Sequence, residues 1–211
     1  MKRMKLGCLL ITGFLVWTWM IQNIDVQPVG VNETEIGFAA LNRWFHELTG
    51  VHMKLYTFTD WLALIPVFAC MIFAGMGFVQ LIRRRSLWKV DKDIIILGVY
   101  YVIVILGYLI FEMYPVNYRP IFIEGRMEAS YPSSTTLLVL SVMPTLIEQV
   151  NRRMKDGLLR KTVKSSVILF SVFMVMGRLI SGVHWFTDIV GAIILSTGMF
   201  FIYNASVNRR F

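Results

Sequence analysis

A histidine and an aspartate stand four positions apart near the carboxyl end of the chain, as His184 and Asp188. On an α-helix this spacing places both side chains on one face, where the carboxylate can accept the imidazole Nδ1–H and fix the tautomer. The other ring nitrogen, Nε2, is then free to act as a nucleophile or a base. Arg178 precedes the pair and provides a permanent planar cation that suits the oxygens of a phosphate group.

Two shorter segments carry groups of the same chemical kind. Residues 117–120 are Asn-Tyr-Arg-Pro, and residues 131–136 are Tyr-Pro-Ser-Ser-Thr-Thr. Pro132 before a run of hydroxyl residues predicts a helix start, at which Ser133, Ser134 and nearby backbone N–H groups can hold an anion. Arg119 adds a second cation. If the fold gathers these segments with His184, the result is a phosphate-binding cavity that contains a nucleophile.

Long apolar runs indicate the elements that must position these residues. Apolar residues make up 56% of the chain and charged residues only 16%, whereas soluble domains carry about 25% charged residues. Residues 6–24 and 94–111 contain no charged side chain, and residues 61–82 contain only Gln80 as a clearly polar one. Runs of about 18 to 22 residues match a hydrocarbon core of roughly 30 Å. The sequence therefore predicts membrane-spanning helices.

The second half of the chain contains three shorter apolar stretches, at residues 133–147, 163–176 and 189–203. Polar residues extend each stretch, so we interpret them as spanning helices whose ends line a polar cavity enclosed by protein, where charge is tolerated. The predicted fold is all-α, a polytopic membrane bundle of about six transmembrane helices. It forms a single domain over residues 1–211.

Basic residues indicate the orientation of this bundle. Most of the 21 lysines and arginines fall in four clusters, at residues 2–5, 83–92, 152–164 and 209–210. These clusters occupy every second connection, as expected for cytoplasmic loops. We predict cytoplasmic termini, a plasma (inner) membrane location and a site on the outer side. The net charge of +8 then reflects topology and contact with anionic membrane lipids, and no motif indicates a nucleic-acid partner.

The first outer loop, about residues 25–59, is the longest connection. Within it, residues 36–48 place apolar side chains near helical spacing, which predicts an amphipathic helix in the outer interface. Two roles stay open for this helix: a lid that packs on the bundle, or a guide for lipid substrates. The sequence gives no prediction of the oligomeric state.

Segment 177–188 resembles the third signature motif of the type 2 phosphatidic acid phosphatase family of lipid phosphate phosphatases. That motif consists of Ser-Arg, five residues, His, three residues and Asp; here Gly177-Arg178, His184 and Asp188 keep the spacing. The segments around Arg119 and Ser133 resemble the first and second motifs, in the same order. The motif resemblance covers residues 111–192, and the six-helix layout extends it to the whole chain.

The resemblance implies a role for each matching residue. His184 would form a phosphohistidine, Asp188 would orient it, and Arg119, Arg178 and Ser133 would bind the phosphate. It implies no metal or other cofactor, which agrees with a sequence that has three histidines and no cluster of metal ligands.

Two positions depart from the family pattern. Glu112 stands where the first motif begins with Lys, and Thr135 stands where the second motif has His. That histidine is the family's usual general acid, a role typically worth about 10²–10⁴-fold in rate. Thr135 can hydrogen-bond but is a poor proton donor. Glu112 is therefore a candidate replacement acid, and Arg126 a candidate replacement for the missing Lys charge.

Two hypotheses of function follow. The first is a membrane lipid phosphatase that hydrolyses a lipid phosphate or a polyprenyl diphosphate through a phosphohistidine. The diphosphate is favoured over phosphatidic acid because its leaving group departs as a stable anion and needs a proton donor far less. The second is a catalytically weak family member that binds lipid phosphates or supports partner proteins.

Overall fold

The structure, a computed structural model, describes residues 1–209. These residues form eight α-helices, two 3₁₀ turns and a two-stranded antiparallel sheet. The helices are α1 (Lys2–Asn23), α2 (Ala39–Thr49), α3 (Met53–Leu62), α4 (Leu64–Arg84), α5 (Lys92–Met113), α6 (Ser134–Arg153), α7 (Leu158–Ile180) and α8 (Phe186–Val207). The short elements are β1 (Gln27–Pro28), η1 (Val31–Glu33), β2 (Glu35–Ile36) and η2 (Leu87–Lys89).

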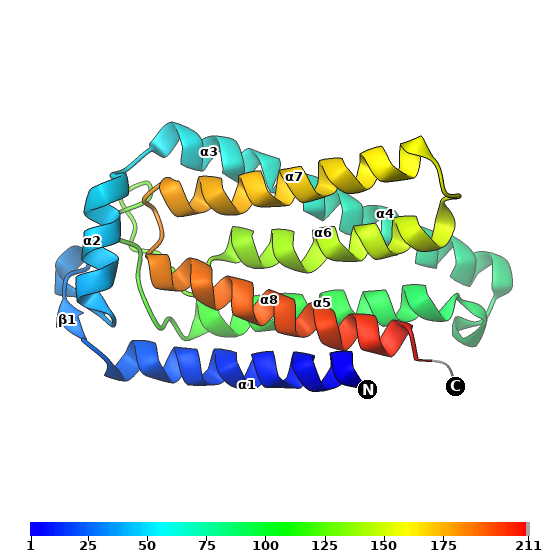
Figure 1. Cartoon of the computed structure of the whole chain (residues 1–211), viewed down its shortest axis with the longest axis horizontal. Helices are drawn as coiled ribbons and strands as arrows, with labels where there is room; N and C mark the ends of the chain where they lie inside the picture. The colour runs from blue at the N-terminus through cyan, green and yellow to red at the C-terminus, as the bar shows by residue number, and fades with distance from the viewer. Residues whose placement is uncertain (210–211) are drawn as a thin grey trace.

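The long helices run side by side along one axis, and α3 continues into α4 as a bent rod (Figure 1). α1 begins and α8 ends at the same end of the bundle, while α2 lies across the opposite end (Figure 1). This arrangement confirms the predicted all-α polytopic bundle. Each of the six expected spans corresponds to one rod.

Five segments of the described chain are long and apolar enough to cross a membrane: α1, residues 53–84, α5, α7 and α8. The sixth rod, α6, contacts α4, α5, α7 and α8. Protein therefore encloses its polar side chains, among them the fully buried Thr145 and Gln149. A helix in such a position can carry polar groups that a lipid-facing helix cannot. Its short apolar stretch reflects this central place.

The connection after α1, predicted to be the first outer loop, is shorter than the sequence predicts. It ends at His52, because α3 begins at Met53, whereas we expected the loop to reach Thr59. Thr59 is fully buried, and its Cγ2 lies against Gly177 of α7. Packing on α7 thus turns a segment of mixed polarity into the first turns of a 32-residue rod. At 1.5 Å per residue that rod spans about 48 Å, more than the roughly 30 Å of a hydrocarbon core.

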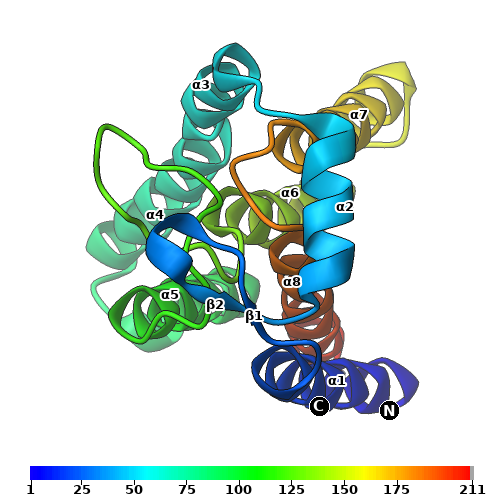
Figure 2. The ribbon, with the colours of Figure 1, turned by 90° about the vertical axis from the view of Figure 1, so that its left-hand side faces the viewer.

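The predicted amphipathic helix of this loop is present as α2. It lies across the ends of α7 and α8 (Figure 2). Buried Asn42 fixes it there: its Nδ2 donates to Gly37 O at 2.9 Å and to Thr187 Oγ1 at 3.0 Å, and its Oδ1 accepts the Thr187 N–H. Trp44 and Leu48 on the other side of α2 are exposed. One face therefore packs on the bundle and the other presents apolar side chains.

Candidate active site

The long loop between α5 and α6 folds back on itself beside the start of α8. Tyr118 and Ala129 form an antiparallel bridge, and the Ser130 N–H donates to Asn117 O at 2.9 Å. This pairing brings Arg119, near the start of the loop, next to Ser130, near its end. Both side chains contact His184. The fold thus gathers the first and third motif segments, as the sequence predicts.

His184 lies in the turn between α7 and α8, two residues before α8 begins. The prediction that His184 and Asp188 share one helix face is therefore wrong. Asp188 occupies the first turn of α8, where its Oδ2 accepts the Trp185 N–H at 2.9 Å. A carboxylate at this position satisfies a free N–H group at the start of the helix. Because of this capping, α8 begins after the histidine and does not include it.

The α7–α8 turn is held tightly against the residues before α3. The His52 N–H donates to Ser181 O at 2.9 Å. Gly182 has a φ of 70°, and a Cβ built on it would lie 1.9 Å from the carbonyl oxygen of Gly50. Only glycine fits both the backbone conformation and this contact. The position of His184 therefore depends on the residues between α2 and α3.

Ser130 stands between the histidine and the aspartate. His184 Nδ1 lies 3.8 Å from Asp188 Oδ2, beyond hydrogen-bond length. Ser130 Oγ donates to Asp188 Oδ2 and lies 3.1 Å from His184 Nδ1, and the Ser130 carbonyl oxygen lies 3.2 Å from the same nitrogen. Asn117 Nδ2 donates to Asp188 Oδ1 at 3.1 Å. The direct Nδ1–H bond to Asp188 expected from the sequence is thus replaced by contacts with Ser130.

Arg119 occupies the other side of the imidazole. Its Nη1 lies 3.3 Å from His184 Nε2, and because a guanidinium can only donate, Nε2 is the acceptor and carries no proton. His184 is 3% exposed. Burial, and then the positive charges of Arg119 and Arg178, hold the pKa of His184 well below its usual range. The imidazole is therefore neutral, with its Nε2 lone pair facing a cation.

Arg178 is 1% exposed and is positioned by α3. Its guanidinium stacks over the Tyr56 ring at 4.6 Å, and its Nη1 lies 3.4 Å from Thr59 Oγ1. Its Nη2 lies 3.4 Å from Asp60 Oδ1, on a side chain that is 56% exposed. Arg119 lies over the same Tyr56 ring at 5.7 Å. One aromatic ring thus places both arginines that the sequence predicts to bind phosphate.

The hydroxyl residues of the second motif occupy different surroundings. Ser133 occupies the N-cap position of α6 without a side-chain capping bond and is fully buried: its Oγ donates to Thr136 Oγ1 at 3.1 Å, and its N–H reaches Asp188 O at 3.3 Å. Ser134 lines the cavity described next. Thr135 does not line that cavity, and faces a smaller one between α5 and α6.

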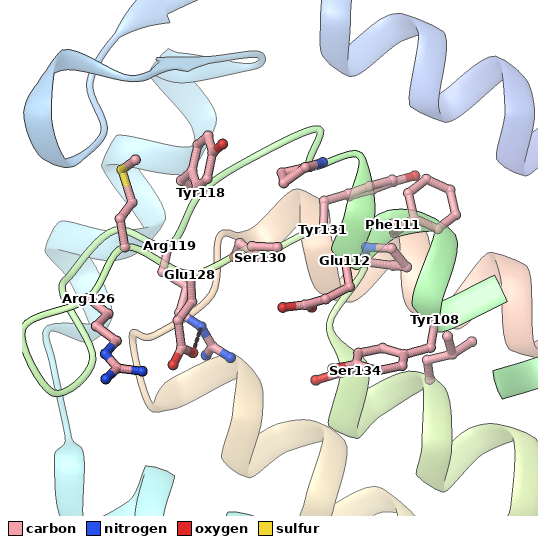
Figure 3. A pocket seen from close by; sticks show the side chains of 15 residues that line it. Tyr108, Phe111, Glu112, Tyr118, Arg119, Arg126, Glu128, Ser130, Tyr131 and Ser134 are labelled. Carbon is pink, nitrogen blue, oxygen red and sulfur yellow. Dashed lines mark ion pairs between the residues drawn. The ribbon is translucent and has the colours of Figure 1, made fainter. Parts of the chain in front are cut away.

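A cavity of about 440 Å³ adjoins this cluster, here called the site cavity. Its lining comes from the end of α5, the long loop and the start of α6, and it includes Tyr108, Glu112, Arg119, Arg126, Glu128, Ser130 and Ser134. Arg119 and Arg126 lie at one end, while Glu112 and Ser134 lie toward the other (Figure 3). Glu128 forms an ion pair with Arg119 Nε at 3.1 Å. Of the three accessory candidates from the sequence, Glu112 and Arg126 line this cavity, and Thr135 does not.

Four residues of the site were not assigned a role from the sequence: Ser130, Asn117, Tyr56 and Asp60. Asn117 belongs to the first motif segment and Ser130 directly precedes the second, but nothing in their spacing indicates contact with Asp188. Tyr56 and Asp60 lie more than a hundred positions before Arg178, and only the packing of α3 on α7 brings them together. Among residues 1–209, no three His, Cys, Asp or Glu side chains cluster as a metal site would require.

The fold and the site together define a polytopic membrane protein with a buried histidine and two arginines at one end of its helix bundle. Residues 95–211, more than half of the chain, match the PAP2 superfamily. The chain therefore belongs to the PAP2 superfamily, as the motif resemblance predicts.

Among solved structures, the chain is similar to a transmembrane PAP2-type phosphatidylglycerolphosphate phosphatase from Bacillus subtilis. The TM-score is 0.66 at 16% sequence identity, and the match covers 97% of this chain and 98% of that one. At this identity the similarity concerns the fold alone. No protein with a curated description matches the sequence significantly.

Proposed function

We propose that the chain is a membrane lipid phosphatase in which His184 is the nucleophile. The observation that supports this most directly is the state of the buried imidazole. Its unprotonated Nε2 faces Arg119, whose Nε is paired with Glu128 Oε2 at 3.1 Å, and the buried Nε–H of Arg178 has no hydrogen-bond acceptor. A phosphate that enters between these groups would supply acceptors to both cations and present its phosphorus to Nε2.

The reaction would proceed in two displacements. In the first, the Nε2 lone pair forms a bond to phosphorus, the bond from phosphorus to the leaving oxygen breaks, and its electron pair departs with that oxygen. In the second, a water oxygen attacks the phosphohistidine, the N–P bond breaks with its electrons returning to Nε2, and inorganic phosphate and a proton are released. Arg119 and Arg178 would stabilise the charge on the non-bridging oxygens in both steps.

Glu112 is the best candidate to protonate the leaving oxygen. It lines the site cavity with Arg119, whereas Thr135, at the position of the family's histidine, lines a different cavity. Glu128 also lines the site cavity, but its carboxylate is engaged by Arg119 Nε at 3.1 Å. If Glu112→Gln left turnover and its pH profile unchanged, Glu112 would be excluded as the acid.

A lipid substrate is supported by the cavity's surroundings. The smaller cavity, of about 200 Å³, shares Tyr108, Ser134 and Leu137 with the site cavity and adds apolar residues of α5 and α6, including Val104 and Leu138. A head group beside the nucleophile could therefore extend an apolar chain between α5 and α6. A water-soluble substrate would gain nothing from this groove.

Between lipid classes, leaving-group chemistry favours a polyprenyl diphosphate over phosphatidic acid. The chain lacks the second-motif histidine, and a phosphate monoester leaves as an anion without a strong acid. Arg126 at the basic end of the site cavity could contact the departing phosphate. Faster phosphate release by the purified protein from phosphatidic acid than from a polyprenyl diphosphate would reverse this preference.

The second candidate function is lipid-phosphate binding, or support of partner proteins, without turnover. A panel of lipid mono- and diphosphates, assayed for released phosphate and for acid-labile, base-stable protein phosphate, separates the two. We expect wild-type protein to release phosphate and to trap label, and His184→Ala to do neither. His52→Ala, an exposed histidine whose ring contacts Thr49 O, is the matched control. Binding of the lipids with no turnover and no trapped label in the wild type would favour the second function.

The orientation stays part of the proposal. The basic clusters at residues 2–5, 83–92 and 152–164 belong to the end of the bundle opposite the site (Figure 1). By the positive-inside rule, the termini would be cytoplasmic and the site would face the outer side of the plasma (inner) membrane.

A further inference from the structure

The hydrogen bonds around His184 leave one consistent assignment of protons. Arg119 can only donate, so Nε2 accepts and the neutral ring carries its proton on Nδ1. Nδ1 therefore donates to Ser130, whose carbonyl oxygen and Oγ lie 3.2 and 3.1 Å away. The Ser130 hydroxyl proton is then directed at Asp188 Oδ2. Each donor has an acceptor in this arrangement. If donor and acceptor were exchanged in any one of these bonds, two N–H or O–H groups, or two lone pairs, would face each other.

We propose that Ser130 is a positioning residue through which Asp188 acts on His184. The Ser130 carbonyl oxygen fixes the Nδ1–H tautomer, and the Ser130 hydroxyl transmits the negative charge of Asp188 to the ring. This inference rests on the proposed function of His184 as nucleophile. It differs from the arrangement expected from the sequence, in which the carboxylate itself holds the imidazole.

Burial supports a relay over a loose contact. Ser130, His184 and Asp188 are 2%, 3% and 0% exposed. Asp188 accepts two further bonds, from Asn117 Nδ2 at 3.1 Å and from the Trp185 N–H at 2.9 Å, and these fix its carboxylate at its 3.8 Å distance from Nδ1. In such surroundings a hydrogen-bonded chain polarises its members more strongly than in water.

The relay has a defined role in the chemical step. When Nε2 bonds to phosphorus, the imidazole keeps its Nδ1 proton and becomes positively charged. The Ser130 oxygens accept a hydrogen bond from that N–H. The Ser130 hydroxyl in turn donates to Asp188, which makes the Ser130 hydroxyl oxygen a better acceptor. No proton needs to leave Nδ1. The stabilisation is greatest in the phosphohistidine and the transition states that flank it.

A double-mutant cycle tests the relay in the full-length protein. Ser130→Ala, Asp188→Asn and the double variant are compared for the rate of phosphohistidine formation. We expect each single change to slow it by about ten- to a hundred-fold, the range of a charge-assisted hydrogen bond. The double variant should be no slower than the slower single variant, because both changes interrupt one path. Multiplying effects, or a Ser130→Ala rate equal to the wild type, would overturn the inference.

Two further measurements separate positioning from a purely structural role. Ser130→Thr keeps the hydroxyl and should restore most of the rate, whereas Ser196→Ala, a buried serine on α8 outside the site, should change nothing. The protein has only three histidines, so ¹⁵N-histidine NMR can follow each ring. We expect the Nδ1–H tautomer for His184 in the wild type and in Ser130→Ala, which retains the carbonyl. An Nε2–H tautomer in the wild type would overturn the inference even if phosphohistidine forms.

If the wild type forms no phosphohistidine, the proposed function fails instead. Phosphohistidine formation that is indifferent to Ser130→Ala leaves the proposed function intact and refutes the relay alone.

Discussion

Gly177 offers a test of how closely α7 and α3 are fitted around the site. It stands where the family's third motif has Ser, and it directly precedes Arg178. A Cβ at Gly177 would lie 2.7 Å from Thr59 Cγ2, about 1 Å inside an ordinary carbon–carbon contact. Gly177→Ser therefore restores the motif but pushes α3 away from α7. The same displacement moves Tyr56 and Asp60, which hold Arg178.

The magnitude follows from two opposing terms. Overpacking costs about 1–3 kcal/mol, while replacing a helical glycine by serine recovers roughly 0.5 kcal/mol of helix propensity. We expect net destabilisation of about 0.5–2.5 kcal/mol, or several degrees in the apparent Tm of a chain of this size. A shift of about 1 Å in Arg178 can lower kcat/KM by up to about 10²-fold.

Thermal unfolding in detergent and phosphate release measure these two effects. Thr59→Ser should rescue Gly177→Ser, because it removes the clashing Cγ2 and keeps the Oγ1 that faces Arg178. Gly75→Ser is the matched control, since a Cβ at Gly75 on α4 would meet nothing within 4 Å. A Gly177→Ser protein as stable and active as the wild type, or one that Thr59→Ser fails to restore, would refute this account of the packing.

Three further predictions concern the site and its groove. Because the pKa of His184 is lowered, its ring stays unprotonated as the pH falls through 6.5. The acidic limb of the plot of kcat/KM against pH should therefore lie below 6.5, and a limb at or above 6.5 would contradict this expectation. Because no metal-ligand cluster exists among residues 1–209, dialysis against EDTA should leave turnover unchanged; loss restored by a divalent cation would be the opposite result. Leu138→Trp should block the smaller cavity between α5 and α6 and slow a long-chain substrate far more than a short soluble phosphate ester. Ile168→Trp, on the exposed face of α7, should slow neither substrate. Equal slowing of both substrates by Leu138→Trp would refute the proposal that this cavity holds the lipid chain.

The architecture could be predicted because a membrane requires it. A hydrocarbon core needs about 20 apolar residues per helix, so three of the six rods are visible directly in the sequence. The remaining three were identified from shorter apolar stretches. The structure explains the short apolar stretch of α6, because four other helices enclose it. The length of α3 could not be predicted in the same way. Thr59 and Asp60 are polar, and only their contacts with α7 make that segment part of a rod.

The sequence predicts which candidate residues lie together better than it predicts the hydrogen bonds between them. The motif resemblance pointed to His184, Asp188, Arg119 and Arg178, and the structure gathers all four at one end of the bundle. The spacing of four between His184 and Asp188 predicted a shared helix face. Asp188 instead caps the start of α8, and the helix begins only after the histidine. Ser130 could not be found by spacing, because its contact with His184 depends on how the long loop folds back.

The protonation state of His184 bears on the choice between enzyme and binding protein. A site that only binds phosphate would gain from a protonated histidine, because a third cation beside Arg119 and Arg178 would attract the anion more strongly. Burial and the two arginines instead keep the ring neutral, and Arg119 Nη1 donates a hydrogen bond to the Nε2 lone pair of His184. That lone pair is of no use to a phosphate-binding protein, since it repels the ligand's oxygens. It is what a nucleophile requires, and so the geometry favours turnover even though the family's usual acid is replaced.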